Sequence, residues 1–161
     1  MISYDRDPQQ TIPESSVKII GLGGAGANML DRAALDGMTG AEMLCINTDM
    51  RTLSSSVAGE KIQIGKNLTK GLGAGGDPEL GLQAAHESEI EIRDALRGRK
   101  MVFVCVGLGG GTGSGAAPLI TRIAREEDHH VPNVDRILDP LPGCHTIKSA
   151  ARAIVDQSHP D

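Results

Sequence analysis

The 161-residue sequence is poor in aromatic side chains, which make up 1% of it, and it has no tryptophan. Its core must therefore be built from aliphatic and small residues. No apolar run approaches the length that spans a membrane, and a net charge of -5 leaves no basic face for nucleic acid or anionic lipid. The N-terminal stretch lacks the features of a secretion signal. We expect a cytoplasmic protein that neither inserts directly into a membrane nor binds nucleic acid.

Cysteine is also scarce. The chain has three cysteines, which are too few for a disulfide framework in a chain of this length. Cys45 and Cys105 lie in apolar, strand-like runs, where a thiol behaves as a small hydrophobic group. The histidines and the cysteine after residue 128 match no structural zinc spacing. The sequence therefore gives no metal ligand, and the cysteines fit a reducing compartment.

Glycine, by contrast, is concentrated. Fourteen of the chain's 21 glycines lie in three short stretches, 21–26, 71–76 and 107–115. The stretch 107–115 follows the apolar run 101–106 and precedes the apolar residues 116–120. A β-branched run, then glycines, then a proline in the first turn of a helical pattern predicts a strand, a loop and a helix.

A loop almost without side chains offers its backbone N–H groups, and at a helix N-terminus these favour an anion such as phosphate. Thr112 and Ser114 add hydroxyl donors. A flexible linker is the alternative, but linkers are not flanked by a buried strand and an apolar helix. A valine at Gly110 or Gly111 is expected to abolish binding of the phosphate ligand, because its side chain blocks close approach to the backbone, and to change the fold less than it changes binding.

The periodicity along the chain predicts an α/β fold. Strands are expected at 17–20, 42–47, 61–64 and 101–106, and helices at 27–35, 51–55 and 77–98 and after residue 115. In the third helix Asp77 is the expected cap and Pro78 the first residue. This order predicts a Rossmann-like, three-layer domain with a mainly parallel sheet, whose ligand edge lies at the carboxyl ends of the strands.

Two nucleotide classes fit this edge. Gly21, Gly23 and Gly26 satisfy G-x-G-x-x-G, and Asp49 ends the next strand where a Rossmann enzyme places its ribose-binding acid. A fragment of an NAD-binding oxidoreductase is therefore one interpretation. A Rossmann fold does not call for two further glycine loops, however, and no G-x-x-x-x-G-K-[ST] motif occurs. Three phosphate-facing loops favour a triphosphate held without a dedicated lysine.

The run Gly109 to Gly115, read GGGTGSG, resembles the signature of the tubulin/FtsZ family, in which it holds the phosphates of GTP. Residues 21–28, 47–49 and 71–79 resemble the family's other nucleotide loops, in the family's order. The resemblance implies a GTP- or GDP-binding domain of a cell-division filament protein, with Mg²⁺ bound through the nucleotide. The residues it assigns to the nucleotide are Gly21, Gly23, Gly24, Ala25, Asn28, Asn47, Asp49, Gly73, Ala74, Gly75, Gly109, Gly110, Gly111, Thr112, Gly113, Ser114 and Gly115.

The resemblance covers the nucleotide-binding domain, 17–128. The polar residues 1–16 before it predict a disordered arm, and residues 129–161 after it predict a turn-rich tail with a candidate amphipathic helix at 146–157. Ala25 stands where the family usually has glycine. The family's second domain, which supplies the catalytic acids, cannot be matched after Asp128, so no catalytic residue is assigned and weak or absent GTP turnover is expected. The implied partners are full-length FtsZ-like subunits bound head to tail, and a non-catalytic regulator that caps their filaments is the alternative.

Overall fold

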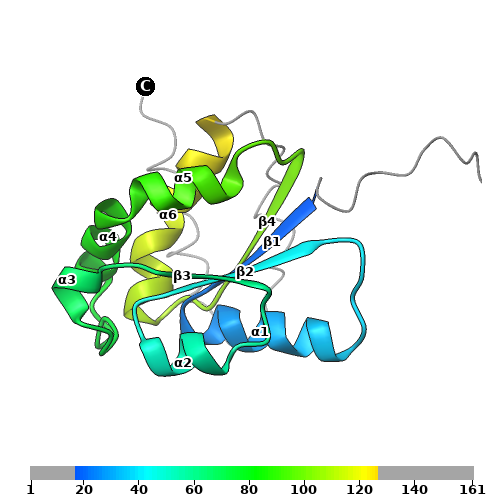
Figure 1. Cartoon of the computed structure of the whole chain (residues 1–161). Helices are drawn as coiled ribbons and strands as arrows, with labels where there is room; N and C mark the ends of the chain where they lie inside the picture. The colour runs from blue at the N-terminus through cyan, green and yellow to red at the C-terminus, as the bar shows by residue number, and fades with distance from the viewer. Residues whose placement is uncertain (1–16, 127–161) are drawn as a thin grey trace, which may run out of the picture.

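The computed structural model describes residues 17–126, in which strands and helices are interleaved along the chain (Figure 1). The expected arm at 1–16 and the expected tail helix at 146–157 lie outside the described residues. The strands are β1 (Val17–Leu22), β2 (Glu42–Asn47), β3 (Glu60–Gln63) and β4 (Met101–Val106). The helices are α1 (Gly23–Leu35), α2 (Met50–Ser55), α3 (Lys66–Thr69), α4 (Pro78–Glu87), α5 (Glu89–Leu96) and α6 (Gly111–Glu126).

The four strands form one parallel sheet in the order β3-β2-β1-β4, which confirms the predicted fold class. The central strand β1 places Ile20 beside Leu44 of β2 and Val104 of β4. Because all strands run in one direction, their carboxyl ends meet at a single edge. Among the described residues, no strand pairs with the outer edge of β3 or of β4.

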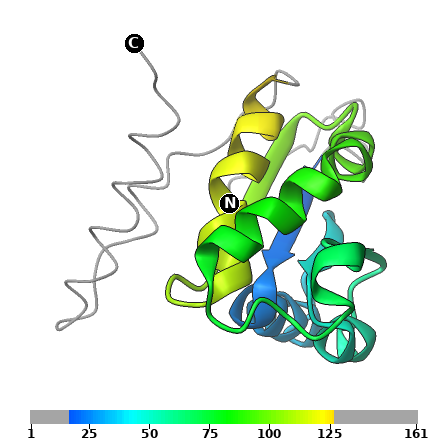
Figure 2. The same ribbon diagram turned by 90° about the vertical axis from the view of Figure 1, so that its left-hand side faces the viewer.

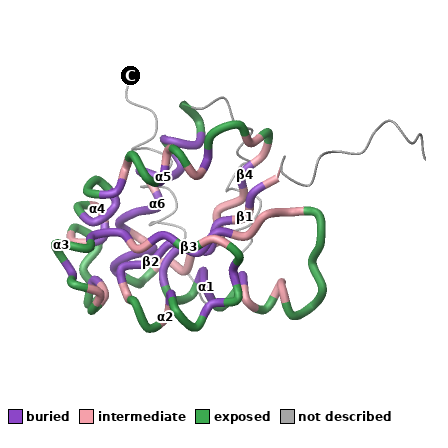
Figure 3. The backbone as a smooth tube through the Cα atoms, viewed as in Figure 1, coloured by how far each residue is buried: buried purple, intermediate pink, exposed green. Residues whose placement is uncertain are grey.

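Helices cover both faces of the sheet, so the domain has three layers (Figure 2). On one face the strands pack against α4, α5 and α6, and residues such as Ile20, Ile92 and Ile120 are fully buried there. The other face packs against α1 and α2 through a smaller cluster that includes Leu30 and Leu53. The buried residues lie where these layers meet, and the exposed residues lie on the outer turns (Figure 3). The core is aliphatic, as the lack of aromatic residues predicted.

The predicted helix at 77–98 is wrong in one respect, because the structure divides it at Ser88 into α4 and α5. Ser88 has backbone angles of φ -111° and ψ 17°, outside the helical range, and its N–H donates to the carbonyl of Ala85 at 3.2 Å. The bend lets both short helices bury residues, Ala84 in one and Ile92 in the other. The four-residue helix α3 was not predicted.

The glycines of two loops belong to helices, which corrects the predicted helix boundaries. Helix α1 begins at Gly23 and α6 at Gly111, each several residues earlier than expected. The N–H of Ser114 already donates to the carbonyl of Gly110 at 3.1 Å. Pro118 therefore lies inside α6 and not in its first turn. Helix propensity disfavours glycine, but packing against the rest of the fold overrides it here.

The amino-terminal edge of the sheet holds a buried charge that the strand pattern did not predict. Lys18 is 1% exposed, and its ammonium group donates to the Glu60 carboxylate at 2.5 Å and to the Ala95 carbonyl at 2.7 Å. It also lies 3.7 Å from the carboxylate of Glu42, which Arg99 contacts at 2.6 Å. These contacts join the starts of β1, β2 and β3 to α5. Charged groups thus gather at the edge opposite the glycine loops.

Candidate functional site

A cavity of about 290 Å³ lies at the carboxyl ends of β1, β2 and β4. All three glycine stretches contribute to its wall, together with the residues that follow β2. It therefore occupies the edge where parallel α/β sheets bind ligands. Its lining residues are Leu22, Gly23, Gly24, Ala25, Asn47, Thr48, Asp49, Thr52, Gly73, Ala74, Gly75, Gly76, Gly107, Leu108, Gly110, Gly111, Thr112 and Gly113.

Most of the residues assigned from the sequence line this cavity, and five do not. Gly21 and Gly115 are packed inside the fold, and Asn28 is exposed on α1. The other two are Gly109 and Ser114, which bond to each other, the N–H of Gly109 donating to the Ser114 hydroxyl oxygen at 3.0 Å. The lining residues not assigned from the sequence are Leu22, Thr48, Thr52, Gly76, Gly107 and Leu108. Of these, Thr48 had a sequence signal, because it stands between two assigned residues.

Helices α1 and α6 both begin at the cavity, and Gly110, which precedes α6, has no side chain that could cap it. The cap position of α1 is Leu22, which makes no side-chain cap, and neither α1 nor α6 has an acidic residue in its first turn. The first N–H groups of a helix have no partner inside it and carry the positive end of the helix dipole. Neighbouring helices differ, because Asp49 caps α2 and Asp77 caps α4, as predicted for Asp77.

The glycines of the three loops divide into two groups. A Cβ atom added at Gly24, Gly75, Gly76, Gly109 or Gly110 would meet no atom from elsewhere in the fold within 4 Å. At Gly111 it would lie 2.6 Å from the backbone nitrogen of Asp77, and at Gly115 it would overlap the carbonyl oxygen of Pro78. The first group leaves open space beside the backbone, whereas the second lets α6 pack closely against α4. Glycine in this signature therefore serves packing as well as ligand approach.

The wall of the cavity carries no lysine or arginine among the described residues, and Asp49 is its one charged side chain. One carboxylate oxygen of Asp49 accepts the N–H of Arg51 at 2.8 Å. Bound anions must therefore be held by backbone donors and by polar side chains. On β4, which leads into the cavity, burial raises the pKa of the Cys105 thiol and makes it a poor nucleophile.

Asn47 supplies an unused donor at this wall. Its side-chain oxygen accepts the N–H groups of Thr48 at 2.8 Å and Asp49 at 3.3 Å, which fixes the orientation of the amide. Its side-chain nitrogen is buried and has no hydrogen-bond partner. Because an unpaired buried donor is costly, a group that accepts from this nitrogen would stabilise the site.

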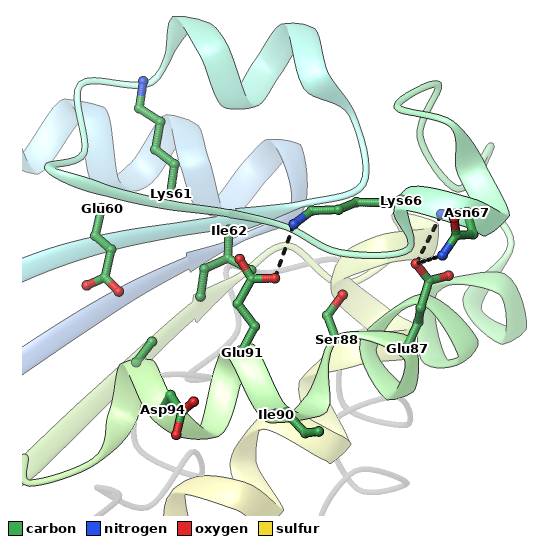
Figure 4. Close-up of a pocket in the computed structure, with 11 residues that line it drawn as sticks. Glu60, Lys61, Ile62, Lys66, Asn67, Glu87, Ser88, Ile90, Glu91 and Asp94 are labelled. Carbon is green, nitrogen blue, oxygen red and sulfur yellow. Dashed lines mark hydrogen bonds and ion pairs between the residues drawn. The ribbon is translucent and has the colours of Figure 1, made fainter.

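A larger cavity, of about 850 Å³, lies between β3, α3 and α5 (Figure 4). Four carboxylates line it against two ammonium groups. Lys66 pairs with Glu91 at 3.2 Å, and Asn67 donates to Glu87 from its backbone and its side chain (Figure 4). This groove offers an anion no comparable set of free donors. The smaller cavity is therefore the candidate site.

The family model for the GTPase domain of the tubulin/FtsZ family matches residues 16–155. The chain belongs to the tubulin/FtsZ family. The match includes all three glycine stretches and extends beyond the expected domain end at residue 128. Within residues 17–126, no helix is long and apolar enough to cross a membrane.

Relatives of known name agree with this assignment. The chain is 47% identical over 137 residues to cell division protein FtsZ 1 of Pyrococcus woesei, covering 85% of this chain and 37% of that protein. It is 52% identical over 126 residues to FtsZ 1 of Pyrococcus horikoshii, covering 77% of this chain and 34% of that protein. The chain therefore spans about a third of the length of these relatives.

Solved structures give the same result. A mutant FtsZ of M. jannaschii matches with a TM-score of 0.72 and 39% identity, covering 88% of this chain and 42% of that one. CetZ2 from Haloferax volcanii, in a GTPγS-bound protofilament, matches with a TM-score of 0.64 and 31% identity, covering 73% of this chain and 38% of that one. The parallel sheet with helices on both faces is thus the fold of these proteins.

The division of the glycines predicts different outcomes at adjacent positions. Gly110→Val places its side chain in open space beside the cavity wall, so we expect nucleotide binding to fall at least about tenfold with little change in melting temperature. Gly111→Val must push against the backbone of Asp77, so we expect a loss of about 2 kcal/mol or more of stability as well. Gly111→Val is therefore expected to affect the fold as well as binding, unlike Gly110→Val. Calorimetric titration and thermal melting measure the two effects, and equal melting temperatures would contradict the division.

Proposed function

We propose that the cavity at the carboxyl edge of the sheet binds GTP or GDP and that its three glycine loops hold the phosphates. The observation that carries this proposal is the pair of helix starts at Gly23 and Gly111, which face one cavity and have no acidic residue in their first turns. A Cβ at Gly23 would lie 3.1 Å from the backbone nitrogen of Gly113, so the two helix starts are adjacent. Adjacent dipoles and free N–H groups suit the closely spaced charges of a polyphosphate.

The proposed role of each loop follows from its place in the wall. Gly23, Gly24 and Ala25 offer N–H groups from the first turn of α1, and Gly111 to Gly113 offer them from α6. The remaining glycine loop contributes Gly73 to Gly76, which close the cavity from the side of α4. Asn47 contributes its unpartnered amide N–H. With no lysine in the wall, backbone dipoles provide the positive potential.

Mg²⁺ is the cation that the family resemblance implies, and the residues present fit a supporting role for the protein. Asp49 is the one carboxylate in the described wall, and capping α2 uses one of its several acceptor positions. Mg²⁺ commonly binds to one or two carboxylates together with phosphate oxygens and water. Most of its ligands would therefore come from the nucleotide, and the bound ion would reduce the charge of the phosphates.

The function of the whole protein extends this proposal. We infer that the chain supplies the nucleotide-binding part of an FtsZ-like filament protein of cell division, whose partners are full-length subunits bound head to tail. The names of its relatives support this, including a cell division protein and a GTPγS-bound protofilament. Capping of such filaments without catalysis is the alternative role.

The chain is expected to bind guanine nucleotide in preference to NAD, because three loops surround the proposed phosphate site whereas a dinucleotide needs only one. Acid precipitation of the purified chain followed by mass spectrometry identifies any nucleotide that it carries. Calorimetric titration of the nucleotide-free chain with GDP, GTP and NAD then compares the affinities. Equal or tighter binding of NAD would favour the oxidoreductase interpretation and contradict the proposal.

GTP turnover by the chain alone is expected to be weak. Backbone donors stabilise phosphate charge, but hydrolysis also needs a group that orients or deprotonates water. Asp49 is the carboxylate in the described wall, and it serves as a helix cap. A phosphate-release assay measures turnover, with the Gly110→Val chain as the matched control. Rapid release by the original chain that the variant abolishes would show that the chain contains its own catalytic group.

A further inference from the structure

Two threonine hydroxyls meet in the wall of the cavity, and the roles proposed for the glycine loops involve only one of the two threonines, Thr112. The hydroxyl oxygen of Thr48 lies 2.7 Å from that of Thr112. Thr48 is fully buried and Thr112 is 7% exposed. The contact joins the end of β2 to the first turn of α6, so it links two of the proposed nucleotide loops directly.

The backbone of Thr48 is fixed on both sides. Its N–H donates to the side-chain oxygen of Asn47 at 2.8 Å, and its carbonyl accepts the hydroxyl of Thr69 at 3.3 Å. The Thr69 hydroxyl also lies 3.0 Å from the carbonyl oxygen of Gly65, so its single proton is shared between the two carbonyls, and Thr69 is itself buried. The Thr48 side chain is therefore held in one place relative to α6.

The number of protons constrains what the pair can do. Each hydroxyl has one proton to donate and two lone pairs that accept. The bond between Thr48 and Thr112 uses one of the two protons, and either oxygen can be the donor. If Thr112 donates to Thr48, it has no proton left for a ligand. If Thr48 donates, the proton of Thr112 is free to point into the cavity.

We propose that Thr48 is a positioning residue that donates to Thr112 and so directs the Thr112 proton toward a phosphate oxygen. This inference rests on the proposed function. Thr112 lines the cavity in the first turn of α6, where a bound anion attracts its proton. A hydrogen bond to a charged oxygen is stronger than one between neutral groups, so the ligand selects this direction. Each bond in such a chain also polarises the next.

The test is a double-mutant cycle on the full chain, read out as GDP affinity by calorimetric titration. Thr48→Val keeps the shape of the side chain but removes the donor, so we expect GDP to bind roughly fivefold more weakly. Thr48→Ser keeps the hydroxyl and is expected to bind within about twofold of the original chain. In a Thr112→Val background, Thr48→Val is expected to change affinity by less than about twofold, because the hydroxyl that it orients is gone.

A matched control separates positioning from general loss of packing. Thr121 is a buried threonine of α6 that does not line the cavity, so Thr121→Val should leave GDP affinity unchanged. Melting temperatures of the ligand-free chains report any loss of stability independently of binding. Rescue by Thr48→Ser together with dependence on Thr112 is not the pattern of a merely structural residue.

Three results would overturn the inference. They are unchanged GDP affinity in Thr48→Val, the same loss of affinity with and without the Thr112 hydroxyl, and failure of Thr48→Ser to restore binding. Each of them leaves the proposed function standing, provided that the original chain binds GDP. If the original chain binds neither GDP nor GTP, the proposed function fails and the inference fails with it.

Discussion

The close approach of α6 to α4 is the constraint on which the candidate site depends. Added Cβ atoms at Gly81, Gly111 and Gly115 would each collide with backbone of the opposing helix. Packing without side chains brings the glycine stretch 71–76, which precedes α4, next to the stretch 107–115, which leads into α6. At the other side of the cavity, Gly26 lets α1 pack directly on the backbone of β4 at Cys105. The cavity is therefore formed by backbone contacts that tolerate no larger residue.

Charge is distributed to match this arrangement. Lys18 and its carboxylate partners occupy the amino-terminal edge of the sheet, and the larger groove beside β3 has more acidic than basic side chains in its lining. The carboxyl edge has almost no charged side chains, but two helix starts with free N–H groups lie there. A site of this kind attracts an anion through fixed dipoles. Such dipoles cost no reorganisation on binding and depend on helix geometry more than on any single side chain.

Most of the architecture could be predicted from the sequence, because apolar runs and glycine clusters alternate regularly along it. The parallel sheet, the ligand edge and the cap at Asp77 follow from these local patterns. What could not be predicted depends on contacts between distant segments. The helical start at Gly111 is stabilised by α4, and the charge of Lys18 is compensated by residues of β2 and β3. The bond between Thr48 and Thr112 likewise exists only once the fold has brought β2 and α6 together.

The central claim is that backbone N–H groups of the glycine loops hold the ligand's phosphates. Amide chemical shifts in a ¹⁵N-labelled chain, followed during titration with GDP, test this most directly. The account predicts that the largest shifts arise at Gly24, Gly75, Gly110 and Thr112, whose amides belong to the cavity wall. Largest shifts at residues of the acidic groove, such as Glu91, with unchanged glycine amides, would contradict it.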